Sequence, residues 1–256
     1  SAIFSTIEEH GSSLALVFMG GVHYLTGQVF PIEEITQAAH DVGALCGWDL
    51  AHAIGNIPLN LHHWEVDFAC WCSYKYLNGG PGAIGGAFIH ERYANDPSLP
   101  RLAGWWGQDN NKRFLLNQSF TPTPGAEGWQ LSGAPILSLS AQLAGLEIIA
   151  EAGFQNMVNK GKMLSDFFIT VLQDINQSVG YSISIITHKD AKGCQVSFQV
   201  PKAGRHLFDM LRKNRVLIDW FEPGIMRAAP VPLYNTFEEI FIFGQILKNS
   251  LSATNQ

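Results

Sequence analysis

Continuous apolar runs and helical periodicity alternate along the first 90 residues. The run LALVFM, residues 14–19, predicts a strand covered on both faces, as in a parallel α/β sheet. Apolar residues spaced three and four apart predict a helix over 31–43 that begins at a proline and ends at a glycine. Further strands are predicted over 44–48, 66–73 and 83–90. Strands that alternate with helices are typical of a doubly wound α/β domain.

The pattern changes after residue 90. Residues 91–127 are rich in Asn, Pro, Gly and aromatics and show little periodicity, which predicts an irregular excursion of a kind that often carries function. Residues 134–176 are helical in pattern, with breaks predicted at Gly153 and Gly161. Strands are then expected over 182–187, 194–200, 216–220 and 225–231, with one helix over 205–213. A last helix is expected to open at Asn235, with Glu238 forming an Asn-type capping box.

These patterns predict two domains. Residues 1–150 are expected to form part of a mainly parallel-sheet large domain, and residues 151–256 a smaller α+β domain. Charged residues make up only 15% of the chain, against about 25% in typical soluble domains. The apolar share is 46%, so low charge combined with ordinary apolar content predicts much surface buried in a core or an interface.

The sequence argues against several classes of binding partner and cellular compartment. The net charge is −6 and no basic run of five residues occurs, so nucleic acids and anionic membranes are poor partners. No apolar run reaches the roughly 18 residues of a membrane-spanning helix, and the N-terminus lacks a signal-peptide pattern. The four cysteines lie within apolar segments, which favours a reducing compartment, the cytosol by default. We interpret Cys70 and Cys72 as buried thiols rather than metal ligands.

Asp49 lies at the carboxyl end of the strand predicted over 44–48, within the apolar sequence WDLAH. Ligand-binding groups in open α/β sheets come from the carboxyl ends of strands. A carboxylate among apolar residues needs a partner, because an unpaired buried charge is costly. The structural alternative is that Asp49 caps the turn that follows. His52 alone is more often a core histidine with satisfied hydrogen bonds.

Lys75 follows the strand predicted over 66–73 and is flanked by Tyr74 and Tyr76. Desolvation lowers the pKa of a lysine and makes it nucleophilic, although an isolated lysine at a loop edge more often extends its ammonium to solvent. An Asp and a Lys that end consecutive strands suit pyridoxal 5'-phosphate (PLP). This cofactor forms a Schiff base with an amine and uses a carboxylate to hold its pyridine nitrogen protonated.

Two further segments carry candidate chemistry. The sequence NGGPGAIG, residues 78–85, formally contains a dinucleotide-binding pattern, but it leads into a strand rather than a helix. We therefore interpret its glycines as a tight turn or a close approach to a ligand. Arg227 lies in the apolar sequence GIMRAAP and needs a carboxylate, which either a substrate or an acidic residue of this chain could supply.

Five segments together closely resemble the kynureninase family: VHYLTGQ (22–28), WDLAHAIGN (48–56), VDFACWCSYKYLN (66–78), GWWG (104–107) and RAAPVPLYN (227–235). The resemblance runs from near residue 14 to near residue 248, and 71–78 is highly specific. It implies an aminotransferase-like fold of type I and a cytoplasmic homodimer with active sites at the subunit interface. The implied reaction is hydrolytic Cβ–Cγ cleavage of L-kynurenine or 3-hydroxy-L-kynurenine to anthranilate or 3-hydroxyanthranilate plus L-alanine. This PLP-dependent step belongs to tryptophan catabolism by the kynurenine pathway, which leads to NAD.

The resemblance also implies residue roles on the cofactor. Lys75 would carry the Schiff base, Asp49 would bind the pyridine nitrogen, and His52 would lie beside the ring. Tyr74 would donate to the phosphate, and Lys75 and Tyr74 would carry the protons of the reaction.

Other implied roles concern the substrate and the neighbouring subunit. Trp105 and the turn Ser132–Gly133 would reach the active site of the partner subunit, and Arg227 would take the substrate α-carboxylate. Animal-type members tend to carry Asn at the position of Gly133, which is associated with the aromatic ring of the substrate, and Ser at that of Gly20. The preference between the two kynurenines therefore stays open.

Family members are much longer, and this sequence lacks the N-terminal region that stacks an aromatic on the pyridine and holds the phosphate. We therefore expect a half-exposed core and a chain that associates readily. One alternative is a catalytically incomplete fragment that only dimerises or binds a partner. Another is a different fold-type I lyase, such as a cysteine desulfurase-like enzyme, which needs a mobile catalytic cysteine; no cysteine occurs between Ser73 and Gly193.

Overall fold

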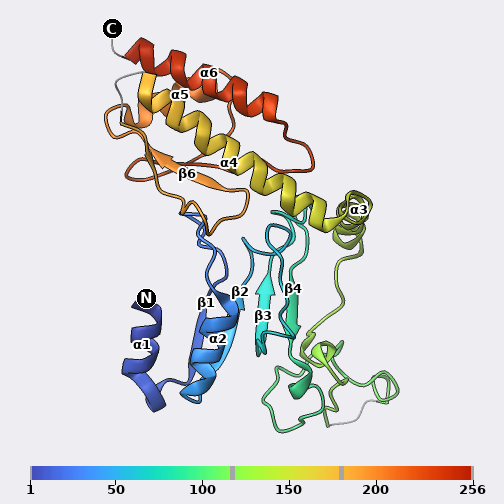
Figure 1. Cartoon of the computed structure of the whole chain (residues 1–256). Helices are drawn as coiled ribbons and strands as arrows, with labels where there is room; N and C mark the ends of the chain where they lie inside the picture. Colours follow the sequence, from blue (N-terminus) through green and yellow to red (C-terminus); the bar gives the residue numbers. More distant parts are fainter. Residues whose placement is uncertain (1, 116–118, 179–181, 255–256) are drawn as a thin grey trace. The chain divides into compact units, whose positions relative to one another are not determined.

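The computed structural model describes residues 2–115, 119–178 and 182–254, and the chain forms two units (Figure 1). The first comprises Ser1–Gly21, Pro31–Ile54 and Leu59–Glu147. The second comprises Val22–Phe30, Gly55–Pro58 and Ile148–Gln256, so it takes two short segments from the first half of the chain. The domain ranges 1–150 and 151–256 stay a prediction.

A four-stranded sheet organises the first unit. Its strands are β1 (Leu16–Gly20), β2 (Leu45–Asp49), β3 (Phe68–Trp71) and β4 (Gly86–Ile89), in that spatial order. The pairs β1–β2 and β2–β3 are parallel, and β4 is antiparallel to β3. The predicted strands are therefore confirmed. Parallel pairing brings the carboxyl ends of three strands to one edge, where Gly20, Asp49 and Cys70 are neighbours in register.

One face of this sheet is covered by α2 (Ile32–Asp41), and α1 (Ala2–His10) with the short turn η1 (Gly11–Ser13) precedes the first strand. Ile35 and Ala39 of α2 are fully buried, as is Trp48 of β2. The Trp48 indole Nε1 donates to Thr36 Oγ1 at 3.1 Å, so the polar atoms at this contact are paired. The predicted helix over 31–43 is confirmed, and its apolar stripe is the part that meets the sheet.

The opposite face of the sheet is open within the described ranges. Leu16, Phe18 and Leu45 are exposed there, and the Phe18 ring stacks on Phe68 with centroids 5.8 Å apart. Phe68 lies flat over Gly47, where an added Cβ would sit 2.2 Å from the ring. The expectation that residues 14–19 are covered on both faces is wrong for the described chain. An apolar run shows that the residues on both faces of a strand are apolar. It does not show which element of the described chain covers each face.

A long helical region links the two units: α3 (Ile136–Ala152) and α4 (Phe154–Ser178). They meet at Gly153, whose φ of +80° favours glycine, so that predicted break is confirmed. The predicted break at Gly161 is wrong. Gly161 lies buried inside α4, where an added Cβ would be 3.4 Å from Cys194 and 3.6 Å from Pro232. Gly161 therefore occupies an ordinary position inside the helix, with room for a methyl group.

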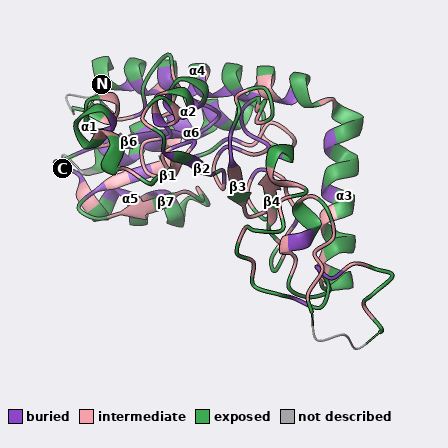
Figure 2. Cartoon of the chain, turned by 90° about the horizontal axis from the view of Figure 1, so that it is seen from below, coloured by how far each residue is buried: buried purple, intermediate pink, exposed green. Residues whose placement is uncertain are grey.

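Much of α3 is exposed (Figure 2), including Ile136, Leu137 and Leu143. No single helix in the described ranges is long and apolar enough to cross a membrane. α3 and α4 meet the length and composition criteria only as a pair, which is bent by 83°.

The second unit is an antiparallel sheet with helices over it. Its strands are β5 (Ser184–Ile185), β6 (Val196–Gln199), β7 (Asp219–Phe221) and β8 (Ile225–Ala228), in the spatial order β5-β6-β8-β7. Together with α4, the helices α5 (Gly204–Lys213) and α6 (Phe237–Thr254) enclose the core, and α4 lies beside α6 (Figure 1). Fully buried members of this core are Leu164, Leu172, Phe198, Leu207, Leu211 and Leu247. The predicted α+β character of this region is confirmed.

The start of α6 differs from the prediction by one residue. Thr236 Oγ1 accepts from Glu239 N at 3.1 Å, and Glu239 Oε2 accepts from Thr236 N at 2.8 Å. This reciprocal capping box replaces the one expected from Asn235 and Glu238. Asn235 Oδ1 instead accepts from Val231 N at 2.8 Å and fixes the chain that leads into the helix.

Candidate active site

Asp49 lies at the carboxyl end of β2 and is exposed, so the expectation of a carboxylate buried among apolar residues is wrong. Strand alternation turns its side chain to the open face of the sheet, whereas Trp48 points into the core. Its Oδ1 accepts from Ala51 N at 2.8 Å, so the capping alternative is present. That bond uses one carboxylate oxygen and leaves the group accessible to a ligand.

Cys70 and Cys72 follow the same alternation on β3 and beyond its end. Cys70 is exposed and Cys72 half-buried, so the interpretation of both as buried thiols is wrong. Cys70 is the register neighbour of Asp49. Partial burial, and then the charge of Asp49, raise the pKa of the Cys70 thiol. No group of three His, Cys, Asp or Glu within the described residues could hold a metal ion.

Tyr74 points into the same region, with 53% of its surface exposed. A hydrogen bond with the Cys72 thiol, and more weakly the negative charge of Asp49, raise the pKa of the Tyr74 phenol. The phenol therefore stays protonated at neutral pH, which suits a hydrogen-bond donor rather than a base.

Lys75 is half-buried, and its Nζ lies 5.5 Å from the centroid of the Tyr74 ring. The ring face attracts the ammonium and holds it beside the phenol. On the other side of the loop, the His52 ring meets Tyr76 edge-to-face with centroids 6.1 Å apart. Thus Asp49, His52, Tyr74 and Lys75, all predicted from the sequence, gather around the turn that follows β3.

The turn that carries Lys75 is closed by its own backbone. Asn78 N donates to Lys75 O at 3.1 Å, and Gly79 N donates to Ser73 O at 2.9 Å. Gly80 and Gly82 both have φ of +77°, so these glycines form a tight turn leading into β4, as the sequence indicated. Ser73 is fully buried, and its Oγ has no hydrogen-bond partner in the described part of the chain.

Helix α3 supports this turn at Gly145. An added Cβ there would lie 2.9 Å from the carbonyl oxygens of Leu77 and Asn78. Since backbone cannot move aside cheaply, we expect Gly145→Ala to lower the free energy of unfolding by about 1–3 kcal/mol and to displace the lysine turn. Urea denaturation measures the first effect.

Gly161→Ala is the matched control for this substitution. It adds the same methyl to a helical glycine but meets only ordinary contacts at 3.4 Å and beyond. Helix propensity should make it neutral or stabilising by up to about 1 kcal/mol. Equal destabilisation by both substitutions would contradict a specific role for Gly145.

The excursion and the segment that follows it carry the two remaining large-domain candidates, Trp105 and the turn Ser132–Gly133. In its described residues it contains the 3-10 turns η2 (Glu91–Tyr93) and η3 (Ala126–Trp129). A Cβ added at Gly133, the neighbour of Ser132, would lie 3.8 Å from the Trp106 ring. The Arg113 guanidinium stacks over Trp105 and Trp106, 5.3 and 4.7 Å from their centroids. Trp105 is 53% exposed, so this aromatic surface is presented outward.

Arg227 belongs to the second unit, on β8. Asp219, its register partner on β7, accepts from Arg227 Nε at 3.0 Å and from Nη2 at 2.5 Å. Nη1 donates to Tyr24 O at 2.7 Å, and the guanidinium lies 4.7 Å from the Phe221 centroid. The intramolecular ion pair is thus present. Because each terminal nitrogen carries a second N–H, the guanidinium retains donors for a further carboxylate.

Sequence reasoning missed three residues that shape these candidates: Cys72 as the partner of Tyr74, buried Ser73, and Asp219 as the partner of Arg227. Of these three residues, only Asp219 could have been identified from the sequence. The predicted strands 216–220 and 225–231 form a hairpin, which places an acidic residue opposite the arginine.

The arrangement of elements is that of fold-type I PLP enzymes. A cysteine desulfurase from Escherichia coli matches 98% of this chain and 62% of its own, with a TM-score of 0.80 and 15% identity. An alanine–glyoxylate aminotransferase from Nostoc sp. matches 99% and 64%, with a TM-score of 0.67 and 19% identity. At such low identity the likeness shows the fold, and it confirms the predicted fold class.

The sequence comparisons point to one family within this fold class. Residues 157–247 match the family model described as the kynureninase C-terminal domain. A kynureninase from Flavobacterium johnsoniae is 49% identical over 251 residues, which are 97% of this chain and 59% of that protein. One from Xanthomonas campestris is 48% identical over 241 residues, 92% of this chain and 56% of that protein. By sequence the chain is a relative of the kynureninases, corresponding to their C-terminal part and spanning about three fifths of their length.

Proposed function

We propose that this chain is the part of a kynureninase that holds PLP and supports hydrolytic cleavage of the Cβ–Cγ bond of L-kynurenine or 3-hydroxy-L-kynurenine. The products would be anthranilate or 3-hydroxyanthranilate and L-alanine. The observation that carries the proposal is the 49% identity to a kynureninase across 97% of the chain. That stretch contains Asp49 and Lys75 at the ends of neighbouring strands.

The residues around the turn after β3 fit PLP by their chemistry. Lys75 offers an amine for the aldehyde of the cofactor, and Asp49 offers an exposed carboxylate for the pyridine nitrogen. Tyr74 is a protonated phenol, and the buried Ser73 Oγ lacks a partner among the described residues, so both can serve an acceptor such as a phosphate. One solved structure that shares this fold, a C-DES variant, has glycine covalently linked to its PLP cofactor.

Each residue then has a definite role. When bound, PLP supplies an electron sink for charge that develops at the substrate Cα. Lys75 would hold the cofactor covalently and, once released, take and return the Cα proton. Asp49 would keep the pyridine nitrogen protonated, His52 would pack beside the ring, and Tyr74 would donate to the phosphate.

The other candidate residues concern the substrate and a second subunit. Arg227 would bind the α-carboxylate through the N–H groups that Asp219 and Tyr24 O leave available. Trp105, Ser132 and Gly133 would complete the site of a second copy in a homodimer. Their exposure on one aromatic surface supports this role. The cytoplasm is the proposed compartment.

The test is an assay of the chain with PLP and each of the two kynurenines. We expect a visible absorbance band and release of anthranilate or its 3-hydroxy form. If this chain gives neither signal while a full-length relative is active, the chain is instead a fragment that only dimerises or binds a partner. Sulfide release from cysteine without kynurenine turnover would identify a desulfurase-like lyase.

The pair Asp219–Arg227 gives a separate prediction. Asp219→Asn removes the charge that orients the guanidinium, so we expect KM for kynurenine to rise by roughly tenfold while kcat stays within about twofold. Asp209→Asn is the control, because Asp209 pairs with Arg205 on the exposed face of α5. A fall in kcat at unchanged KM would contradict a carboxylate-binding role for Arg227.

A further inference from the structure

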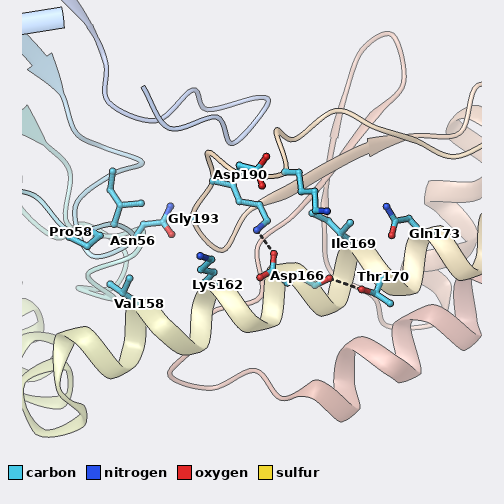
Figure 3. Close-up of a pocket in the computed structure, with 13 residues that line it drawn as sticks. Asn56, Pro58, Val158, Lys162, Asp166, Ile169, Thr170, Gln173, Asp190 and Gly193 are labelled. Atoms are coloured by element: carbon cyan, nitrogen blue, oxygen red, sulfur yellow. Dashed lines mark hydrogen bonds and ion pairs between the residues drawn. The ribbon is translucent and has the colours of Figure 1, made fainter. Parts of the chain in front are cut away.

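A cavity of about 570 Å³ opens in the second unit between α4, the loop 189–193 and the segment 56–58 (Figure 3). Ligand-binding cavities in proteins span about 300–1,000 Å³, so this one can hold a small organic molecule. None of the residues assigned above to the PLP or substrate site lines it.

The cavity carries an excess of positive charge. Lys162, Lys189 and Lys192 line it with three ammonium groups, against the two carboxylates of Asp166 and Asp190. Figure 3 shows Lys162 and Asp166 rising from α4 toward the loop that carries Asp190. Lys162 and Lys189 are exposed at the mouth of the cavity, so the surplus cation can attract an anion from solution toward the buried Lys192.

Lys192 is the buried member of this set. Only 2% of its side chain is exposed, and its Nζ donates to Asp166 Oδ1 at 2.5 Å. An ammonium has three N–H donors, and a buried one needs partners for them. Asp166 is 51% exposed and satisfies one donor, which leaves Lys192 able to bind a further acceptor within the cavity.

The backbone around Lys192 is fixed in place. Asn56 Oδ1 accepts from Cys194 N at 3.0 Å, and an added Cβ at Gly193 would sit 2.2 Å from that same oxygen. Val29 N donates to Ala191 O at 2.9 Å on the other side of the loop. The loop is therefore held before any ligand arrives, which reduces the entropy lost on binding.

The rest of the lining is apolar or neutral. Ile57, Pro58, Val158 and Ile169 supply apolar surface, and Gln173 adds an amide. A site with a cationic end and an apolar wall is complementary to a molecule that has one anionic group on an apolar body.

We propose that this cavity binds a small organic anion, with its carboxylate or phosphate on Lys162 and Lys192 and its apolar body against Ile57, Pro58 and Ile169. The inference does not depend on the proposed enzymatic function. Carboxylate and phosphate share the oxyanion chemistry that lysines recognise, and the experiment separates them.

Calorimetric titration of the chain with benzoate, phenyl phosphate and benzamide tests the proposal. Benzamide has nearly the shape of benzoate but no charge. We expect saturable binding of at least one anion, weakening with added salt, and at least about tenfold weaker binding of benzamide. Equal binding of benzamide and benzoate would overturn the proposal, as would no saturation by either anion at tens of millimolar.

Two substitutions locate the binding. Lys162→Gln should weaken anion binding by about five- to tenfold, whereas Lys202→Gln, on the exposed surface outside the cavity, should leave it unchanged. Asp166→Asn should tighten it, because the Lys192 ammonium is no longer neutralised. A purely structural ion pair would instead lower Tm without tightening anion binding. Unchanged affinity in Lys162→Gln, or no gain in a folded Asp166→Asn, would contradict the site.

Discussion

Replacing Lys75 by alanine is expected to remove the visible absorbance that the chain acquires with PLP and to lower anthranilate release by at least about 10³-fold. The expectation rests on the place of Lys75 beside Tyr74, in the turn that follows β3. The substitution removes both the amine that would hold the cofactor and the group that would move the Cα proton. Absorbance spectra before and after borohydride, with a fluorescence assay for anthranilate, measure the two losses.

Lys202→Ala is the matched control, because it removes an exposed lysine that lies outside the turn. It should retain the absorbance band, its bleaching by borohydride and the rate of product release. A Lys75→Ala chain that still shows a borohydride-sensitive visible band would exclude Lys75 as the residue that holds the cofactor.

Asp67→Asn should lower the free energy of unfolding by about 2–4 kcal/mol. Asp67 is 2% exposed. It accepts from Tyr93 Oη at 2.5 Å, from Cys46 N at 2.6 Å and interacts with His40 Nε2 at 2.9 Å. Asparagine has one acceptor oxygen and one NH₂ group where aspartate has two acceptor oxygens. Its NH₂ would face groups that themselves donate, so at least one buried donor would lose its acceptor.

The same network predicts the pH dependence. Burial by itself would raise the pKa of Asp67, but hydrogen bonds from Tyr93, Cys46 N and His40 outweigh it and hold that pKa below its usual value. Burial and then the bond to Asp67 raise the pKa of Tyr93 to about 12, so the phenol remains a donor. Because the folded pKa of Asp67 is lowered, its stabilisation is present above about pH 4 and is lost as pH falls through the folded pKa.

Urea denaturation of wild type and Asp67→Asn across pH 3–7 tests both statements. The difference in stability should be constant above about pH 5 and should shrink below about pH 4. Asp41→Asn, at the exposed end of α2, should change stability by less than about 0.5 kcal/mol. A difference for Asp67→Asn that grows as pH falls would contradict the assigned direction.

Local patterns predicted the elements well because their causes are local. The period of apolar residues placed α2, and the apolar runs placed the strands of both sheets. The errors concern information that no local pattern contains. A glycine within a helical pattern can mark a break, yet Gly161 lies inside the continuous helix α4, packed near Cys194 and Pro232, which are distant in sequence. The run 14–19 is apolar enough for two covered faces, yet Leu16 and Phe18 are exposed in the described chain.

In the candidate site, too, local features could be predicted and features that depend on distant residues could not. Strand ends could be predicted, so Asp49 and Lys75 could be assigned to one edge of a sheet. Side-chain direction could not be predicted, because it depends on register, and the exposure of Asp49 and Cys70 follows from their shared face. The partner of Arg227 required the pairing of β7 with β8, which the sequence indicates only when both strands are considered together.

The position at which PLP attaches to this chain tests the proposed role of Lys75 most directly. Borohydride reduction of the chain with PLP, followed by peptide mass spectrometry, locates the pyridoxyl group. We expect modification at Lys75, and its loss in Lys75→Ala. Modification spread over exposed lysines such as Lys202 and Lys189, with Lys75 unmodified, would contradict it.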